Sequence, residues 1–176
     1  MDHIHNSQPS EFLVENVSLL PKGRVLDVAM GRGRNAIYLA KLGFQVEGVD
    51  ISKQSVDEAL IQAREEGVHI EARVVDLEKG FRIEPEAYDV LVCFNYLQRS
   101  LIPNIKAGIK PGGMVVYETF IIDQAELFGK PRNQYFLLKH NELLELFRDF
   151  RCLRYREGVI GNYKAIAGIV AQKTTK

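Results

Sequence analysis

This 176-residue sequence has few cysteines and no net charge: it holds two cysteines, and its 23 basic side chains balance 23 acidic ones. A balanced charge argues against the strong phosphate-binding field of nucleic-acid-binding proteins, so we expect a small-molecule partner and no nucleic acid. Cys93 and Cys152 form neither a disulfide framework nor a metal-ligand spacing. The scarcity of thiols therefore favours a reducing compartment and no metal site.

Long hydrophobic runs are also absent. No apolar stretch approaches the roughly 18 residues that a membrane span needs, and residues 1–10 lack the basic and apolar regions of a signal peptide. We therefore expect a cytoplasmic protein with no membrane contact, either a monomer or a homodimer. With 46% hydrophobic residues the chain is long enough for one sizeable core. We predict a single domain over residues 1–176, in which residues 1–22 form a lead-in helix or lid segment.

Apolar runs alternate with helical patterns along the rest of the chain. The runs predict strands over residues 24–29, 44–49, 68–75, 88–94 and 114–118, and the amphipathic stretches predict helices over 11–19, 35–42, 53–66, 97–109 and 138–150. A turn is predicted at 110–113, and an antiparallel hairpin is predicted from 151–159 and 163–172. This order is typical of an α/β fold with a Rossmann-like, doubly wound and mostly parallel seven-stranded sheet, helices on both faces and a C-terminal antiparallel hairpin.

The chemistry should concentrate at the carboxyl ends of the strands, where doubly wound sheets bind ligands. Residues 31–36 (GRGRNA) fit the pattern G-x-G-x-x-G/A, and Asp50 follows about 20 residues on. Glycine lets the backbone approach a ligand closely, and the helix start behind it favours a negative group. That group is either the pyrophosphate of a dinucleotide or the carboxylate of a methionine moiety.

Two features favour the methionine moiety of a methyl donor. Asp27 lies inside the first predicted strand, four positions before Gly31, where its charge would oppose a pyrophosphate but attract an ammonium. The chain also ends in a predicted strand pair rather than in a second βαβαβ half. A nicotinamide-dependent oxidoreductase and a non-catalytic protein that binds S-adenosylmethionine are the alternatives.

Four segments carry a family resemblance: RVLDVAMGRGRNAIYLAKLG at 24–43, VEGVDIS at 46–52, VVDL at 74–77 and KPGGMVVYE at 110–118. They resemble the class I S-adenosylmethionine-dependent methyltransferases, and GRGRN together with VVDL is similar to the tellurite-resistance-like branch. The resemblance covers about residues 20 to 170 and implies S-adenosylmethionine as cofactor. The residues that it implies for donor binding are Asp27, Ala29, Gly31, Gly33, Asn35, Asp50, Ile51, Ser52, Asp76, Leu77, Phe94 and Asn95.

Roles follow from the same resemblance. It implies that Gly31 and Gly33 wrap the methionine part, with Asp27 near its amino group, while Asp50 holds the ribose and Asp76 the adenine amino group. The physical case for Asp50 is independent, because an ionised carboxylate can accept two hydrogen bonds from a vicinal diol.

Methyl transfer from a sulfonium is an in-line displacement whose leaving group is already activated. Alignment of the reactants alone can lower such a barrier by roughly 7–11 kcal/mol, so a dedicated base is not always needed. We therefore expect a methyltransferase for a small-molecule acceptor and assign no catalytic residue. Acceptor contacts are expected from residues that follow or end strands on the ligand side, namely Tyr96, Arg99, Tyr117, Glu118 and Arg132.

Overall fold

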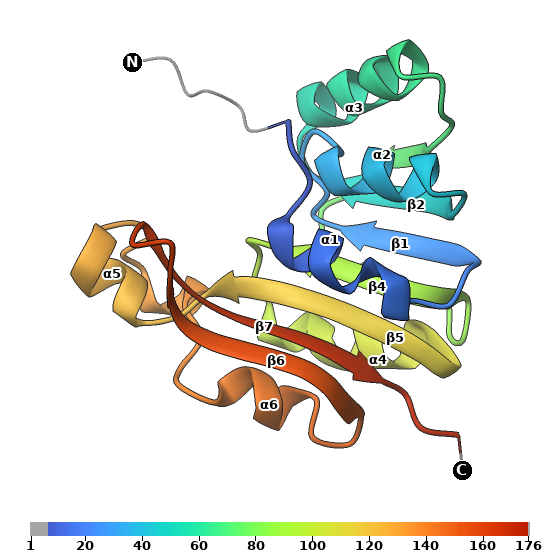
Figure 1. Cartoon of the computed structure of the whole chain (residues 1–176). Helices are drawn as coiled ribbons and strands as arrows, with labels where there is room; N and C mark the ends of the chain where they lie inside the picture. The colour runs from blue at the N-terminus through green and yellow to red at the C-terminus, as the bar shows by residue number, and fades with distance from the viewer. Residues whose placement is uncertain (1–6, 176) are drawn as a thin grey trace.

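The computed structural model describes residues 7–175, so the first six residues of the predicted lead-in lie outside its description. Its strands form one seven-stranded sheet in the order β3-β2-β1-β4-β5-β7-β6 (Figure 1). The strands are β1 (Arg24–Val28), β2 (Gln45–Asp50), β3 (Glu71–Val74), β4 (Tyr88–Phe94), β5 (Ile109–Phe120), β6 (Arg151–Ile160) and β7 (Lys164–Gln172). Strands β1 to β5 pair in parallel, and β7 is antiparallel to both β5 and β6. The predicted fold class and the C-terminal hairpin are confirmed.

Helices cover both faces of this sheet (Figure 1). They are α1 (Glu11–Asn16), α2 (Arg34–Lys41), α3 (Lys53–Glu65), α4 (Ile102–Gly108), α5 (Asp123–Phe128) and α6 (Glu142–Leu146), with short 3-10 turns η1 (Val17–Leu19), η2 (Arg99–Leu101) and η3 (Gln134–Phe136). Within residues 7–175, no helix combines the length and the apolar character that crossing a membrane requires.

The alternation of side chains along the central strands divides the core into two layers. In β4, Leu91 and Cys93 pack toward α4 and α6, whereas Val90 and Val92 pack toward α1, α2 and α3. Both layers are apolar because the parallel strands are covered on both faces. The same alternation places the side chains of Asp27, Phe94 and Glu118 on the side of α1 to α3, since Asp27 pairs with Val92 and Phe94 pairs with Glu118.

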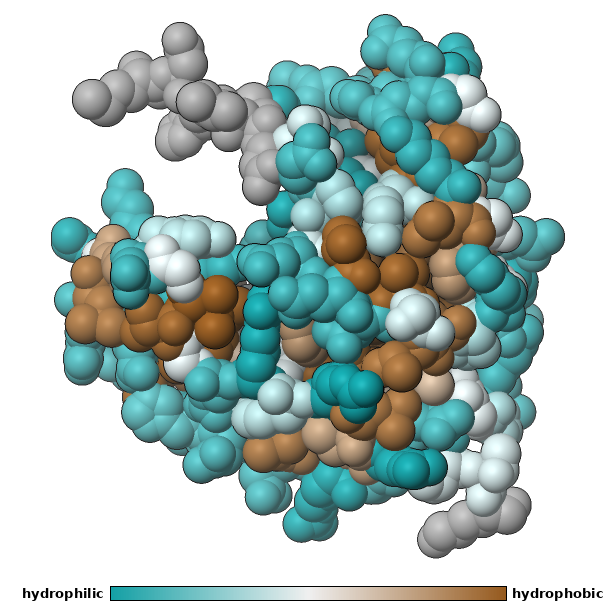
Figure 2. All heavy atoms as spheres, in the orientation of Figure 1, coloured by the Kyte–Doolittle hydropathy of each residue, from teal (hydrophilic) through white to brown (hydrophobic). Residues whose placement is uncertain are grey.

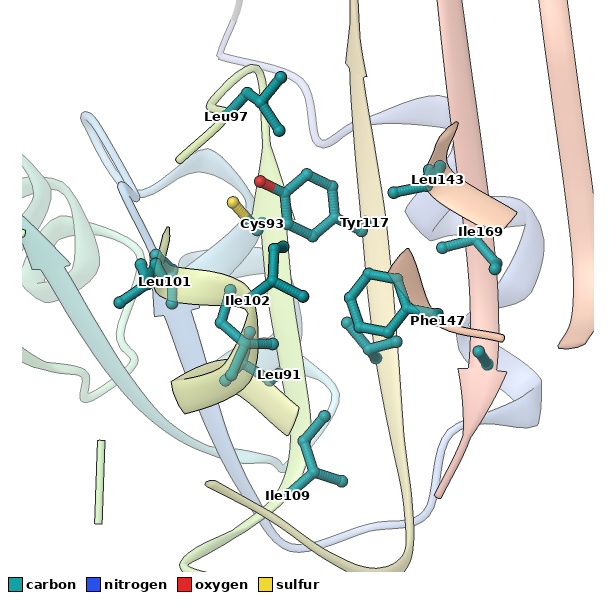
Figure 3. Close-up of a cluster of buried hydrophobic side chains, with 14 of the residues drawn as sticks. Leu91, Cys93, Leu97, Leu101, Ile102, Ile109, Tyr117, Leu143, Phe147 and Ile169 are labelled. Atoms are coloured by element: carbon teal, nitrogen blue, oxygen red, sulfur yellow. The ribbon is translucent and has the colours of Figure 1, made fainter. Parts of the chain in front are cut away.

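The layer beneath α4 and α6 is the larger cluster of buried side chains (Figure 3). Tyr117 from β5 lies between Cys93 and Phe147, and its ring centroid is 6.1 Å from that of Phe147. Burial raises the pKa of the Cys93 thiol to about 12. Cys93 is therefore a core residue that stays protonated at neutral pH.

Two predicted helices are shorter in the structure. The segment predicted as helical over 138–150 forms helix only in α6, because Leu138 is buried in an extended conformation that bridges to Ile121, and Asn141 has a positive φ of 63°. The helix predicted over 97–109 begins only at 102, after the 3-10 turn η2, because Gln98 is extended, with a φ of −135° and a ψ of 100°. Neither the left-handed Asn141 nor the extended Gln98 can continue a right-handed helix.

Two further boundaries differ from the prediction. The strand predicted over 68–75 is reduced to the four residues of β3. The turn predicted at 110–113 lies inside β5, where Gly112 has a φ of 81° and the pairing with β4 shifts register between Tyr88 and Val90. A bulge therefore absorbs the turn residues without ending the strand.

Candidate active site

A glycine loop joins β1 to α2 and bends sharply between them. Gly31 and Gly33 have positive φ angles of 56° and 77°, and the backbone N–H of Gly33 donates to the carbonyl of Met30 at 3.0 Å. A Cβ on Gly33 would lie 2.9 Å from the Cβ of Ala59 in α3, whereas a Cβ on Gly31 would meet nothing within 4 Å. Gly33 is therefore required for helix packing, and Gly31 leaves open space beside the loop.

Asp50, the last residue of β2, ties this loop to the start of α3. Its Oδ2 accepts a hydrogen bond from the N–H of Gly31 at 2.9 Å, and its Oδ1 accepts one from the N–H of Ser52 at 2.9 Å. Ser52 in turn caps α3 by accepting from the N–H of Ser55. Each carboxylate oxygen has two acceptor sites, so Asp50 keeps a free acceptor site on both oxygens for a ligand hydroxyl.

Asp27 is a buried carboxyl group with an unsatisfied oxygen. The residue is 2% exposed, and its Oδ2 has no hydrogen-bond partner among residues 7–175. Burial raises the pKa of Asp27 to about 8, and the neighbouring Asp50 also raises it, while the guanidinium of Arg34 and the amide of Ala36 lower it. A buried acceptor of this kind normally has a partner, so Asp27 has the properties of a site for a cationic ligand group.

The N-terminal segment is held against the start of α2. Arg34 donates to the carbonyl of Gln8 at 3.2 Å and to the hydroxyl of Ser10 at 3.0 Å. The side-chain oxygen of Asn35, which is buried, accepts from the N–H of Ser10 at 2.8 Å. These bonds place residues 7–9, which belong to the segment predicted as a lead-in helix or lid, on the rim of the site.

A cavity of about 1100 Å³ opens at the carboxyl ends of β1, β2 and β4. Its wall includes seven of the twelve residues expected to bind the donor, namely Asp27, Ala29, Gly31, Asn35, Asp50, Phe94 and Asn95. Residues 7–9, Met30 and Arg34 also line it, and none of these was among the expected donor residues. The sequence analysis predicted a lead-in helix or lid over residues 1–22, but no motif indicated which of its residues would line the cavity.

The other five expected donor residues are not among those that line the cavity. Gly33 and Ser52 shape the ends of α2 and α3, and Ile51 is 66% exposed. Asp76 accepts from the N–H of Glu78 at 3.0 Å, and Leu77 is buried. Their use by a ligand stays a prediction.

The five residues expected to contact an acceptor are dispersed. Tyr96 lines the cavity, and Arg132 lies on an open surface and donates to the carbonyl of Gly129. Tyr117 is instead 1% exposed, with its hydroxyl donating to the carbonyl of Tyr96 at 2.6 Å, so a direct substrate contact is not available in this structure.

The remaining two residues expected to contact an acceptor, Arg99 and Glu118, each form an ion pair within the protein. Arg99 binds both carboxylate oxygens of Glu142, at 2.5 and 2.9 Å. Glu118 is buried on the side of α1, and its Oε2 accepts two hydrogen bonds from Arg156, at 3.1 and 2.9 Å. Burial raises the pKa of Glu118 despite this partner.

Across residues 7–175, no group of three or more His, Cys, Asp or Glu is placed to hold a metal ion.

Comparison with protein families identifies the chain. The family described as "Tellurite resistance protein TehB" matches residues 4–167. The chain belongs to the TehB family. This assignment confirms the resemblance to the tellurite-resistance-like branch of the class I S-adenosylmethionine-dependent methyltransferases.

Individual relatives of this TehB-family chain match it in sequence or in fold. It is 35% identical over 105 residues to the ubiquinone biosynthesis O-methyltransferase of Burkholderia thailandensis, which corresponds to 57% of this chain and 45% of that protein. The crystal structure of TehB from Haemophilus influenzae matches with a TM-score of 0.76 and 24% identity, over 92% of this chain and 61% of that one. A SAM-dependent methyltransferase from Methanosarcina mazei matches with a TM-score of 0.73 and 18% identity, over 96% and 100% of the two chains. The chain spans about half the length of the curated relatives it matches.

Proposed function

We propose that this TehB-family chain binds S-adenosylmethionine in the cavity beside Asp27 and Asp50 and transfers its methyl group to a small-molecule acceptor. When bound, S-adenosylmethionine supplies a methyl group on a sulfonium, which is activated for in-line displacement. The residues that would hold it are those of the cavity wall at the ends of β1, β2 and β4.

The observation that carries this proposal is the unpartnered Oδ2 of Asp27 in the cavity wall. An ammonium group fits there, because it can donate a hydrogen bond to Oδ2 and compensate the carboxylate charge. The phosphates of a nicotinamide cofactor gain less here, because a second negative charge keeps Asp27 protonated and forgoes the charge attraction that an ammonium makes with the ionised form. The comparisons also favour a methyltransferase over an oxidoreductase.

Asp50 supports the adenosine part of the proposal. Its two oxygens are held in fixed positions by the N–H groups of Gly31 and Ser52. Each oxygen can accept one further hydrogen bond, which matches the two hydroxyls of a ribose. Binding to a preorganised acceptor pair saves the entropy of fixing a mobile side chain.

The test is calorimetric titration of the protein with S-adenosylmethionine, S-adenosylhomocysteine, NADH and NADPH, in wild type and in Asp50→Ala. We expect micromolar binding of the two adenosyl ligands only. Loss of two charge-assisted hydrogen bonds, worth roughly 1.5–3 kcal/mol each, should weaken them at least about 100-fold in Asp50→Ala. Asp57→Ala, an exposed acid paired with Lys53 on α3, is the matched control and should bind like wild type. Binding of a nicotinamide cofactor alone would refute the proposal.

Catalysis is tested separately, by mass-spectrometric detection of methyl transfer to a panel of small thiols, amines and phenols. Turnover of any acceptor distinguishes an enzyme from a protein that only binds the donor.

We further propose that the chain is one domain that acts in the cytoplasm, as a monomer or a homodimer, on a small molecule and not on nucleic acid. The free thiols of Cys93 and Cys152 support a reducing compartment such as the cytoplasm, and the zero net charge supports a small-molecule partner over nucleic acid.

A further inference from the structure

Two adjacent aromatic side chains stand exposed on the segment between α5 and α6. Tyr135 is 57% exposed and Phe136 is 44% exposed, and their rings meet edge to face with centroids 5.6 Å apart. Figure 2 shows that hydrophobic surface also gathers over the α5 region, at the left of the view and beside a hollow. Exposed Leu127 belongs to α5.

Arg99 holds this aromatic pair at a fixed place. Its guanidinium donates to the carbonyl of Tyr135 at 2.8 Å and to the carbonyl of Leu137 at 2.9 Å, while Glu142 fixes its other face. The next segment is also tied to the sheet, since the N–H of Leu138 donates to the carbonyl of Phe120 at 2.9 Å. These hydrogen bonds therefore fix the backbone under the two rings, while both rings stay partly exposed.

The same arginine connects the pair to the cavity. Arg99 opens η2 three residues after Tyr96, which lines the cavity, and the hydroxyl of Tyr96 donates to Gln98 at 2.8 Å. Burial raises the pKa of the Tyr96 phenol, and the charges of Glu78, Cys93, Asp76 and Tyr135 raise it further. Tyr135 and Phe136 are not among the residues that line the cavity, but the hydrogen bond from Arg99 to the Tyr135 carbonyl joins their backbone to the segment that follows Tyr96.

We propose that Tyr135 and Phe136 form a stacking platform for a flat, aromatic methyl acceptor, held beside Tyr96 by the Arg99–Glu142 pair. This inference rests on the proposed function, because the platform has its meaning next to a bound methyl donor. Aromatic rings prefer stacked or edge-to-face partners, and such pairs add roughly 0.5–1.5 kcal/mol beyond the area that they bury. Two side chains offer far less than the roughly 800 Å² per partner of a stable protein interface, so a small molecule fits better than a second protein.

The experiment compares 2-naphthol with decahydro-2-naphthol, which has the same carbon skeleton and hydroxyl group but no flat ring. Both are titrated by saturation-transfer NMR into protein saturated with S-adenosylhomocysteine. We expect 2-naphthol to bind about tenfold more tightly than the saturated compound, which corresponds to the upper part of the aromatic contribution. Equal affinities, tighter binding of the saturated compound, or binding of neither compound would overturn the inference.

The matched variants locate the effect. The double variant Tyr135→Ala/Phe136→Ala should lose the tenfold preference, whereas Tyr163→Ala, which removes another exposed ring at the β6–β7 turn, should keep it. Both should bind S-adenosylhomocysteine like wild type, which also verifies folding. A preference that survives in the double variant contradicts the platform. So does a fall in sedimentation mass in that variant, since the rings would then contact a second copy of the chain.

The two proposals fail in different ways. Absence of S-adenosylhomocysteine binding in wild type refutes the proposed function, and the platform with it. Normal binding of S-adenosylhomocysteine without a preference for 2-naphthol refutes the platform alone.

Discussion

The burial of Asp27 makes donor binding depend on pH in a defined direction. Burial raises the pKa of this carboxyl group to about 8. At pH 6 Asp27 is therefore neutral in the unliganded protein, and an incoming ammonium group must displace its proton to meet a carboxylate. One pKa unit corresponds to 1.36 kcal/mol, so affinity should rise about tenfold per pH unit between pH 5.5 and 7.5 and level off above pH 8.

Calorimetry with S-adenosylhomocysteine tests this prediction in two ways. The dissociation constant should fall about 100-fold from pH 5.5 to pH 7.5 in wild type and stay nearly constant in Asp27→Asn. Titrations at pH 6.5 in buffers of different ionisation enthalpy should reveal the release of about one proton per ligand in wild type and none in the variant. A flat profile without proton release in wild type would refute the reasoning, because Asp27 would then be ionised before the ligand arrives.

The raised pKa of Asp27 also makes the stability of the unliganded protein depend on pH, in the direction opposite to donor affinity. The pKa of Asp27 is raised on folding from 3.8 to about 8, so folding favours the protonated form and the free energy of unfolding falls as pH rises between these values. Asp27→Asn does not titrate. Urea unfolding at pH 5, 6 and 7 should therefore show the variant gaining about 1.4 kcal/mol per pH unit relative to wild type. A constant difference would contradict the buried neutral state.

Three further substitutions test other parts of the site. Arg156→Met leaves the buried Glu118 without its partner and should lower the free energy of unfolding by about 3–5 kcal/mol in urea titrations, with most of the loss recovered when Glu118→Gln is added. Arg34→Ala releases the N-terminal segment and should raise the dissociation rate of S-adenosylhomocysteine in stopped-flow measurements, whereas the exposed Arg154→Ala should leave the rate unchanged. Gly33→Ala combines a left-handed φ with a close approach to α3 and should reduce stability by about 1–3 kcal/mol; an unchanged melting temperature would contradict the role given to the loop.

Features that depend only on residues close in the sequence could be predicted from it. The positive φ angles at Gly31 and Gly33 need glycine, and Asp50 follows the loop at the spacing that a βαβ unit requires. The apolar run of β4 is long and uninterrupted, so its limits were predicted to the residue. The loop, the acids at the strand ends and the C-terminal hairpin were therefore predictable from local physical requirements.

Contacts between distant segments were decided by the tertiary structure alone. The clamp from Arg99 reaches residues 36 to 43 positions away, and no local pattern encodes it. The same holds for the insertion of β7 between β5 and β6, and for the extended Leu138 that shortens the last helix. The unsatisfied oxygen of Asp27 likewise appears only when β2, β4 and α2 close around β1. Sequence determined which groups stand at the ligand edge of the sheet because backbone geometry is local, whereas burial and partner choice, which set charge and access, depend on the packing of the whole chain.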